Sequence, residues 1–363
     1  MNTTERLEFI VDAVRSGDTV RARGGGSKPA LSGRANLKLA ALSGILEYDP
    51  SEYTFTALAG TSVLEVQELL ERHGQFLPFD PVLVEAGATL GGTVAAGLSG
   101  PGRQRYGGVR DFILAVQFVD GLGRIVRGGG KVVKNAAGFD LPKLHCGSLG
   151  RFGILSELTF KVFPVPKDWI TLRFEFKHMH NALEAVIELG GSSFDLYALE
   201  LLDKTVLVRL GGLRSAFSER VGNLENFLGQ HCEVFEVDAE IWREAREFLW
   251  QPNGSSLVKI PLTPAKIPGF ETRLRETGLG HSARRFSSGG NLAWICVDEV
   301  AALEPILIGL GLAGLVINGP SVQDSRDHGL IGEQSGLGML SRIAQALDPN
   351  GVFDLNSRSA NAA

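Results

Sequence analysis

Cysteine is scarce in this sequence, and the few cysteines are not arranged as metal ligands. The 363 residues include three cysteines, Cys146, Cys232 and Cys296, and no two of them have C-x-x-C spacing. A zinc site built on paired cysteines and an iron–sulfur cluster are therefore disfavoured, and we predict no metal site. A sparse, odd set of cysteines also favours a reducing cytoplasm over a disulfide-forming compartment.

Long apolar runs and an excess of basic residues are missing too. The longest apolar stretch, residues 305–317, is shorter than the ~20 residues that a bilayer-spanning helix needs. The first 17 residues place acids among apolar positions at helical spacing, which does not fit a signal peptide. The net charge of −5 argues against a nucleic-acid partner. We therefore expect a soluble, cytoplasmic globular protein.

The motifs of the common nucleotide-binding sites do not account for this chain. No segment fits the Walker pattern G-x-x-x-x-G-K-[ST]. Residues 121–126 (GLGRIV) begin like the Rossmann motif G-x-G-x-x-G, but they lack its third glycine and follow a predicted hairpin turn. An ordinary NAD or ATP site is therefore disfavoured.

Glycine is abundant instead, and much of it lies in the first half of the chain. The sequence has 46 glycines, which cluster in residues 24–33, 87–108, 121–130 and 147–153. Consecutive glycines let backbone N–H groups converge on an anion such as a phosphate, although each turn alone could equally be a tight turn. Three such turns, each beside a predicted strand, favour one extended, phosphate-bearing ligand.

Hydrophobic periodicity predicts an α+β protein with a change of texture near residue 166. A helix at 62–74 would be capped by Thr61 or Ser62 and turn Leu64, Leu69 and Leu70 inward. Other helices are expected at residues 4–15, 89–100, 180–189, 214–230 and 239–250, and strands at 19–24, 37–60, 112–129, 150–166, 168–177, 195–212 and 291–299. Glycine turns thin out after Pro166, so we place a domain boundary there.

Three segments of the chain resemble the vanillyl-alcohol-oxidase superfamily of FAD flavoproteins. They are RGGGSKPALSG (23–33), the stretch 80–166 with GATLGGTVAAG and GFDLPKL, and LDPNGVFDLNSR (347–358). Within that superfamily the chain is most similar to the FAD-binding subunits of bacterial glycolate oxidases. The resemblance implies a PCMH-type FAD-binding domain of two α+β subdomains in residues 1–166. It also implies a smaller α+β cap domain with an antiparallel sheet in 167–340, and a segment, 341–363, that returns to the FAD domain.

The resemblance further implies which residues surround FAD. The first loop would wrap the pyrophosphate, the second turn would flank the pyrophosphate and ribitol, and the third would cover the ribose and adenine. The residues concerned are Gly24, Gly25, Gly26, Ser27, Lys28, Gly33, Thr89, Gly91, Gly92, Gly147, Ser148, Gly153 and Ile154. Covalently flavinylated relatives carry a histidine where Ser27 stands here, so we expect non-covalent FAD.

The function that the resemblance implies is FAD-dependent oxidation of glycolate, or a related 2-hydroxy acid, to the 2-oxo acid. It also implies a larger homologous flavin subunit and an iron–sulfur subunit as partners, through which the chain could lie peripherally at the inner membrane. Two alternatives stay open. One is a flavin-bearing structural or electron-relay subunit, and the other is a self-sufficient FAD oxidase or dehydrogenase for another substrate.

The sequence provides no evident catalytic base. Hydroxy-acid dehydrogenases of this superfamily usually carry an H-x-G-D-G-N-x-H segment, which supplies a metal and a base, and none of the seven histidines here lies in such a setting. Oxidation of an alcohol requires a group that accepts the hydroxyl proton. The catalytic residues are thus unknown from the sequence, and we expect the isolated chain not to be reduced by glycolate at a useful rate.

Polar residues near the glycine turns have two interpretations. Arg103, Arg105 and Tyr106 follow the second turn and could approach the flavin or a carboxylate substrate, or could face solvent. The family-like stretch 134–140 (KNAAGFD) could contact the cofactor, or its polar residues could pair with Asp140. The residues in question there are Lys131, Lys134 and Asn135.

The histidines and tryptophans are better explained by structure than by chemistry. His178 and His180 have the spacing of metal ligands but no third ligand, so a solvated strand end is expected. His145 and Cys146, beside the third turn, are expected to pack in the interior. A stripe in the helix at 239–250 is expected in the core of the second domain: Trp242, Phe248, Leu249 and Trp250.

Overall fold

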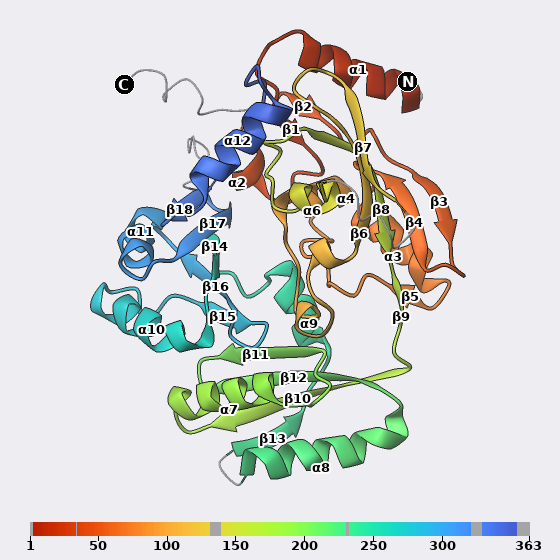
Figure 1. Cartoon of the computed structure of the whole chain (residues 1–363). Helices are drawn as coiled ribbons and strands as arrows, with labels where there is room; N and C mark the ends of the chain where they lie inside the picture. The colour runs from red at the N-terminus through yellow and green to blue at the C-terminus, as the bar shows by residue number, and fades with distance from the viewer. Residues whose placement is uncertain (1–2, 34, 131–138, 230–231, 321–328, 354–363) are drawn as a thin grey trace.

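The computed structural model describes residues 3–33, 35–130, 139–229, 232–320 and 329–353. Within those residues the strands form two larger antiparallel sheets, which lie in separate halves of the molecule (Figure 1). One sheet has five strands in the order β3-β4-β8-β6-β7, and the other has nine in the order β13-β10-β12-β11-β15-β16-β14-β17-β18. Helices pack against both sheets, so the predicted α+β class is confirmed.

The five-stranded sheet is built around the hairpin that the sequence predicts at Asp120. The Oδ1 atom of Asp120 accepts hydrogen bonds from the N–H groups of Leu122, at 3.0 Å, and Arg124, at 2.9 Å, which fixes the turn. The strands are β3 (Ile45–Asp49), β4 (Thr54–Leu58), β6 (Ile113–Val119), β7 (Ile125–Gly129) and β8 (Ile154–Lys161). Their apolar side chains share a core with α3 (Val63–Glu71) and α4 (Leu90–Ala96).

Helix α3 corrects one detail of the sequence analysis. Ser62 is the N-cap, and its hydroxyl accepts a hydrogen bond from the Leu64 N–H at 3.2 Å. The helix therefore begins at Val63 and turns Val63, Val66 and Leu70 inward. The expectation that Leu64 points inward is wrong, because this phase of the helix leaves its side chain 46% exposed.

The first and the last described segments of the chain meet beside the five-stranded sheet. Helix α1 (Thr3–Arg15) packs on residues 352–353, and the Val20 N–H donates to the Val352 carbonyl oxygen at 2.9 Å. Helix α12 (Leu337–Leu347) crosses back towards α1 (Figure 1). The remaining elements of this half are β1 (Ala22–Arg23), α2 (Pro29–Ser32), β2 (Leu37–Lys38), β5 (Gln75–Phe76), α5 (Arg103–Tyr106), η1 (Val109–Asp111), α6 (Leu141–His145) and β9 (Phe163–Pro164).

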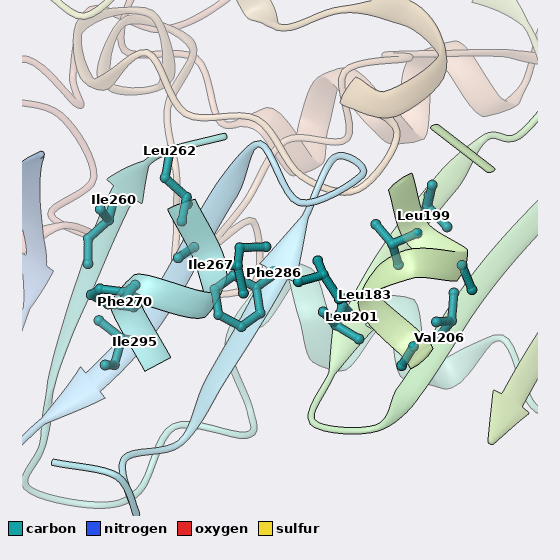
Figure 2. Close-up of a cluster of buried hydrophobic side chains, with 14 of the residues drawn as sticks. Leu183, Leu199, Leu201, Val206, Ile260, Leu262, Ile267, Phe270, Phe286 and Ile295 are labelled. Atoms are coloured by element: carbon teal, nitrogen blue, oxygen red, sulfur yellow. The ribbon is translucent and has the colours of Figure 1, made fainter. Parts of the chain in front are cut away.

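The nine-stranded sheet carries most of its helices on one face, over a large apolar core. Figure 2 shows part of this core, in which Leu183 and Phe270, each from a helix, and Phe286 of a central strand are among the labelled side chains. The strands are β10 (Asp168–Phe176), β11 (Ala198–Leu202), β12 (Thr205–Gly212), β13 (Cys232–Glu236), β14 (Ser256–Pro261), β15 (Arg284–Ser287), β16 (Leu292–Val297), β17 (Ala313–Asn318) and β18 (Leu330–Gly332). The helices are α7 (Met179–Gly191), η2 (Arg214–Ala216), α8 (Phe217–Leu228), α9 (Glu240–Glu247), η4 (Pro264–Lys266), α10 (Ile267–Glu276) and α11 (Val300–Gly309).

Helix α9 joins the two halves. Its Glu247 carboxylate accepts hydrogen bonds from the backbone N–H groups of Val84, at 2.9 Å, and Glu85, at 3.2 Å. Arg243 of the same helix pairs with the Glu85 carboxylate through two hydrogen bonds. Trp242 is buried as predicted, whereas the expectation for Leu249 is wrong, because its side chain is 55% exposed.

The longest apolar stretch of the sequence spans two elements. The apolar stretch 305–317 is the end of α11 followed by β17, a helix that leads into a buried strand. Among the described residues, no helix has the length and apolar character needed to cross a bilayer.

Candidate functional site

The first glycine loop lies between β1 and α2 and approaches the second loop closely. A Cβ atom added to Gly24 would collide with the Thr89 hydroxyl, and one added to Gly25 would collide with the Gly87 carbonyl oxygen. Gly26 has φ +81°, which a residue with a Cβ atom rarely adopts. The loop therefore requires glycine at these three positions, two for close approach and one for its backbone conformation.

The second turn begins α4. Thr89 is its N-cap, and the Thr89 hydroxyl accepts a hydrogen bond from the Gly92 N–H at 3.3 Å. Gly91 packs directly on the preceding strand, because its N–H donates to the Ala59 carbonyl oxygen at 2.7 Å. At its N-cap the turn lies directly against the first loop, where Thr89 approaches Gly24.

The third turn follows α6 and contains several positive φ angles. Gly147, Gly150 and Gly153 have φ values of +81°, +80° and +144°, and Leu149 has φ +55°. A Cβ atom at Gly153 would run into the Phe118 ring, so the backbone lies against the five-stranded sheet there. The Ser148 side chain is buried beside it.

The three turns line one pocket, which we call the first pocket. It encloses about 800 Å³ outside the protein atoms, including its open mouth. The predicted residues that line it are Gly24, Gly25, Gly26, Ser27, Lys28, Thr89, Gly91, Gly92, Ser148, Gly153 and Ile154. The structure does not place Gly33 there, since Gly33 ends α2 beside the Arg21 guanidinium. Gly147 lines a different pocket.

Lys28 is the charged group of the first pocket that is most buried. Its Nζ atom donates to the Ser27 hydroxyl at 3.1 Å. Burial lowers the pKa of Lys28 to about 8, and the negative charge of Glu247 offsets part of this shift. Burying an ammonium group away from water is costly unless an anion pairs with it. This site therefore suits a ligand that carries negative charge.

A second pocket begins where the first one ends. Ala96 and Leu149 line both pockets, so the two pockets adjoin at these residues. The second pocket lies between the end of α4 and strands β14, β17 and β18, and encloses about 970 Å³ including its mouth. It therefore lies at the junction of the two halves of the molecule.

Positive charge dominates the second pocket. Arg103, Arg110 and Lys259 line it, against one acid, Asp111, whose Oδ2 atom accepts a hydrogen bond from the Gly108 N–H at 2.8 Å. Among the described residues, no acidic side chain pairs with Arg103 or Lys259. A pocket with these charges attracts an anion such as a carboxylate.

Lys259 is the residue that the sequence analysis missed. It lies in β14, and its Nζ atom donates to the Gly97 carbonyl oxygen at 3.2 Å. Burial, reinforced by the charge of Arg103, lowers the pKa of Lys259 to about 8. The signal in the sequence was a single lysine inside the apolar run SLVKIP, where a sheet-forming side chain would be expected.

Arg105 and Tyr106 serve a different purpose from Arg103. Arg105 forms an ion pair with Asp195, and the Tyr106 ring meets the Tyr197 ring edge-on at 5.4 Å between centroids. Burial raises the pKa of Tyr106 further above its ordinary value, together with its hydrogen bond to Tyr197. These two residues bind α5 to the nine-stranded sheet, and of the three candidates Arg103 is the one that lines the second pocket.

The remaining candidates do not extend the site. His145 is buried against Phe118, with ring centroids 4.2 Å apart, and burial lowers its pKa to about 4. Cys146 lines the second pocket, where burial raises the pKa of its thiol to about 12. His178 lies at the start of α7, and His180 pairs with Glu184 on the surface. The candidates Lys131, Lys134 and Asn135 lie outside the described residues.

The described residues contain neither a metal cluster nor a Rossmann turn. No group of three or more His, Cys, Asp or Glu side chains among them could hold a metal ion. Residues 309–314 (GLGLAG) fit the letters of the Rossmann motif, but they lead from helix α11 into strand β17, which is the reverse of the order that the motif needs.

Comparison with solved structures supports the fold. The chain superposes on a crystal structure of alkyldihydroxyacetonephosphate synthase with a TM-score of 0.70, covering 96% of this chain and 74% of that one. The two sequences are 15% identical, so the likeness concerns the fold alone.

Sequence relatives identify the family. Residues 2–129 match the family described as an FAD binding domain. The chain is 35% identical to the glycolate oxidase subunit GlcE of Escherichia coli over 246 residues, which are 66% of this chain and 67% of that protein. It is 31% identical to a D-lactate dehydrogenase of Anaerostipes hadrus over half of this chain and 38% of that enzyme. The chain thus belongs to the family of FAD-binding oxidoreductases that includes glycolate oxidase subunit GlcE.

Proposed function

We propose that the first pocket holds the adenine, ribose and diphosphate of a non-covalent FAD and that the second receives its flavin end with the substrate. The observation that carries this proposal is that the two pockets adjoin, with Ala96 and Leu149 lining both. The three glycine turns that line the first pocket form what we call the glycine cradle. The glycine cradle fits a diphosphate, because backbone N–H groups and the buried Lys28 replace the water that the anion loses. The proposed ligands are the predicted residues that line the first pocket: Gly24, Gly25, Gly26, Ser27, Lys28, Thr89, Gly91, Gly92, Ser148, Gly153 and Ile154.

The proposed reaction is oxidation of glycolate, or a related 2-hydroxy acid, to the 2-oxo acid. FAD supplies the acceptor for the two electrons. Arg103 and Arg110 attract and orient the substrate carboxylate, since a guanidinium stays charged and matches a carboxylate in shape. The names of the relatives, a glycolate oxidase subunit and a D-lactate dehydrogenase, support this class of substrate.

The proposed setting is a heteromeric complex in the cytoplasm, with a larger homologous flavin subunit and an iron–sulfur subunit that takes the electrons onward. The similarity to a protein named as a subunit supports this part. In this proposal residues 1–166 form the FAD-binding domain, 167–340 the cap or interface domain, and 341–363 the returning segment. Peripheral contact with the inner membrane would occur through the partners.

One experiment tests the cofactor and the substrate together. The purified chain is loaded with FAD, its absorbance spectrum is recorded, and glycolate and D-lactate are added without oxygen, with and without the larger flavin subunit. The proposal predicts stoichiometric flavin and its bleaching by at least one of the acids in one of the two preparations. A chain that binds flavin but is bleached in neither preparation would favour the electron-relay alternative.

A further inference from the structure

Lys259 is a titratable side chain that lines the second pocket. It extends from β14, which lies between β16 and β17 in the nine-stranded sheet, across to the end of α4, where it donates to the Gly97 carbonyl oxygen at 3.2 Å. The side chain is half-buried and lines the second pocket, which adjoins the glycine cradle. It thus lies beside the region that the proposed function assigns to the flavin end and the substrate.

The other titratable groups of this pocket are less suited to exchanging a proton near neutral pH. Arg103 and Arg110 stay charged. Asp111 is exposed, and its Oδ2 atom is held by the Gly108 N–H. Burial raises the pKa of the Cys146 thiol to about 12, and this thiol contacts the Pro142 carbonyl oxygen at 3.5 Å.

We propose that the neutral amine of Lys259 accepts the hydroxyl proton of the 2-hydroxy acid. This inference rests on the proposed function. The substrate O–H bond breaks and its electron pair forms the second bond of the new carbonyl group. The hydrogen on the same carbon leaves with its electron pair to the two-electron acceptor, FAD. The proton goes to Lys259 Nζ, which becomes an ammonium and later releases it to solvent through the mouth of the pocket.

The surroundings of Lys259 favour this role. Both burial and the charge of Arg103 disfavour its ammonium form, so with a pKa of about 8 roughly a tenth of the side chain is neutral at pH 7. The hydrogen bond to Gly97 fixes the amine at the wall of the pocket. Arg103, in α5, pairs with no acidic side chain among the described residues and is available to hold the carboxylate. One pocket thus provides both a cation and a base.

The first test is the pH dependence of flavin reduction in the FAD-loaded chain. Glycolate and D-lactate are mixed with the protein without oxygen, and the rate constant for bleaching is measured between pH 6 and 10. We expect the rate to rise about tenfold per pH unit below a pKa near 8 and to level off above it. A rate that does not change over this range would overturn the proposal.

The second test uses variants of Lys259. Lys259→Met should keep FAD and slow bleaching by ~10²–10⁴-fold, the usual contribution of a positioned base. Lys259→Arg should be equally slow, because a guanidinium keeps its proton, and added primary amines should partly restore the rate in Lys259→Ala. Lys204→Met is the control, since Lys204 is exposed in the β11–β12 turn. A normal rate in Lys259→Arg would assign only a positive charge to this position and overturn the proposal.

The outcomes separate this inference from the function on which it rests. If the isolated chain is not bleached at any pH but is bleached once the larger flavin subunit is present, the inference is wrong and the proposed function stands. If neither preparation is bleached, both are wrong. If the isolated chain is bleached, and the rate rises with pH up to a pKa near 8 as predicted, the inference stands. The expectation that the chain alone is inactive, which comes from the missing histidine motif, is then wrong.

Discussion

The Nζ atom of Lys259 lies 3.2 Å from the carbonyl oxygen of Gly97, a residue 162 positions earlier in the chain. Gly97 ends α4 in the left-handed conformation, with φ +62°, so its carbonyl group is turned away from the helix. This contact therefore joins the nine-stranded sheet to the helix that begins at the glycine cradle. It also places a lysine with a lowered pKa at the wall of the second pocket.

Two lysines with lowered pKa values make the stability of the cofactor-free protein depend on pH. The pKa of Lys28 and that of Lys259 are each about 8 in the folded chain, against 10.5 ordinarily. Between these values the unfolded chain binds a proton that the folded chain does not, so the free energy of unfolding rises with pH from about 8 to 10.5. Below pH 8 both states are protonated, and the cost of burying the charge is constant.

Replacing Lys28 should remove its contribution to the rise of the free energy of unfolding with pH. We expect Lys28→Met to make the cofactor-free protein more stable at pH 7 by up to about 3 kcal/mol and to flatten the curve between pH 8 and 10. Urea titrations at pH 7, 8, 9 and 10 measure this, with Lys204→Met as the surface control. A Lys28→Met curve parallel to that of the original chain would contradict the lowered pKa.

The glycine cradle should tolerate no side chain at Gly25. Two reasons predict that Gly25→Val fails, a lack of room for a side chain and a positive φ. The structure supports the first, because a Cβ atom at Gly25 collides with the Gly87 carbonyl oxygen, whereas the positive φ belongs to Gly26. We still expect Gly25→Ala and Gly25→Val to lose stoichiometric FAD, measured by flavin absorbance per chain. Gly222→Ala, in α8 with open space around it, is the matched control. Full FAD in Gly25→Val would show that the first loop is only a turn.

The sequence predicted the cradle because its signals are local. Positive φ angles and close backbone approach leave glycine as the suitable residue, and runs such as Gly24, Gly25 and Gly26 are visible without any knowledge of the fold. The role of Lys259 was missed for the opposite reason. Its neighbours in the pocket, Gly97 and Arg103, come from distant parts of the chain, so its role depends on a contact between the two halves.

Helical phase explains the smaller errors. Leu64 lies among the leucines of an amphipathic pattern, but the cap at Ser62 fixes where the helix begins and therefore which face is buried. Leu249 follows the end of α9, where Phe248 takes φ +55° and redirects the chain outward. Apolar periodicity indicates that such helices exist, whereas their exact phase depends on caps and on residues that end them.

The cofactor should be released by acid. Ser27, whose hydroxyl accepts a hydrogen bond from Lys28, offers no imidazole for attachment to the flavin. Precipitation of the FAD-loaded chain with trichloroacetic acid should leave all of the yellow colour in the supernatant. Colour that stays with the washed, denatured pellet would mean that another residue binds the flavin covalently.

Tyr106 should matter for the junction of the two halves and not for catalysis. Its ring contacts Tyr197, Phe163 and Phe76 at centroid distances between 5.3 and 5.9 Å. Tyr106→Ala should lower the free energy of unfolding by about 2–4 kcal/mol, whereas Tyr106→Phe should cost about 1 kcal/mol through the lost hydrogen bond to Tyr197. Thermal unfolding and flavin reduction are measured together. A large loss of reduction rate in stable Tyr106→Phe would return Tyr106 to the list of catalytic candidates.

Arg103 should determine how tightly the substrate carboxylate binds. It lines the second pocket without a paired acid among the described residues, and a hydrogen bond to a charged group is worth about 1.5–3 kcal/mol. We therefore expect Arg103→Met to raise the glycolate concentration needed for half-maximal flavin reduction by roughly 10- to 100-fold, with FAD content unchanged. Arg103→Lys should recover part of the loss, because it keeps the charge but not the planar fork.

The control for Arg103 is Arg273→Met, in which an exposed arginine that pairs with Glu276 on α10 is removed. Its half-maximal concentration should equal that of the original chain. Raising the salt concentration should weaken glycolate binding in the original chain more than in Arg103→Met, since screening acts on the charge that the variant lacks. Equal salt dependence in the two proteins, with equal half-maximal concentrations, would place the substrate carboxylate away from Arg103 and make Arg110 the next arginine to replace.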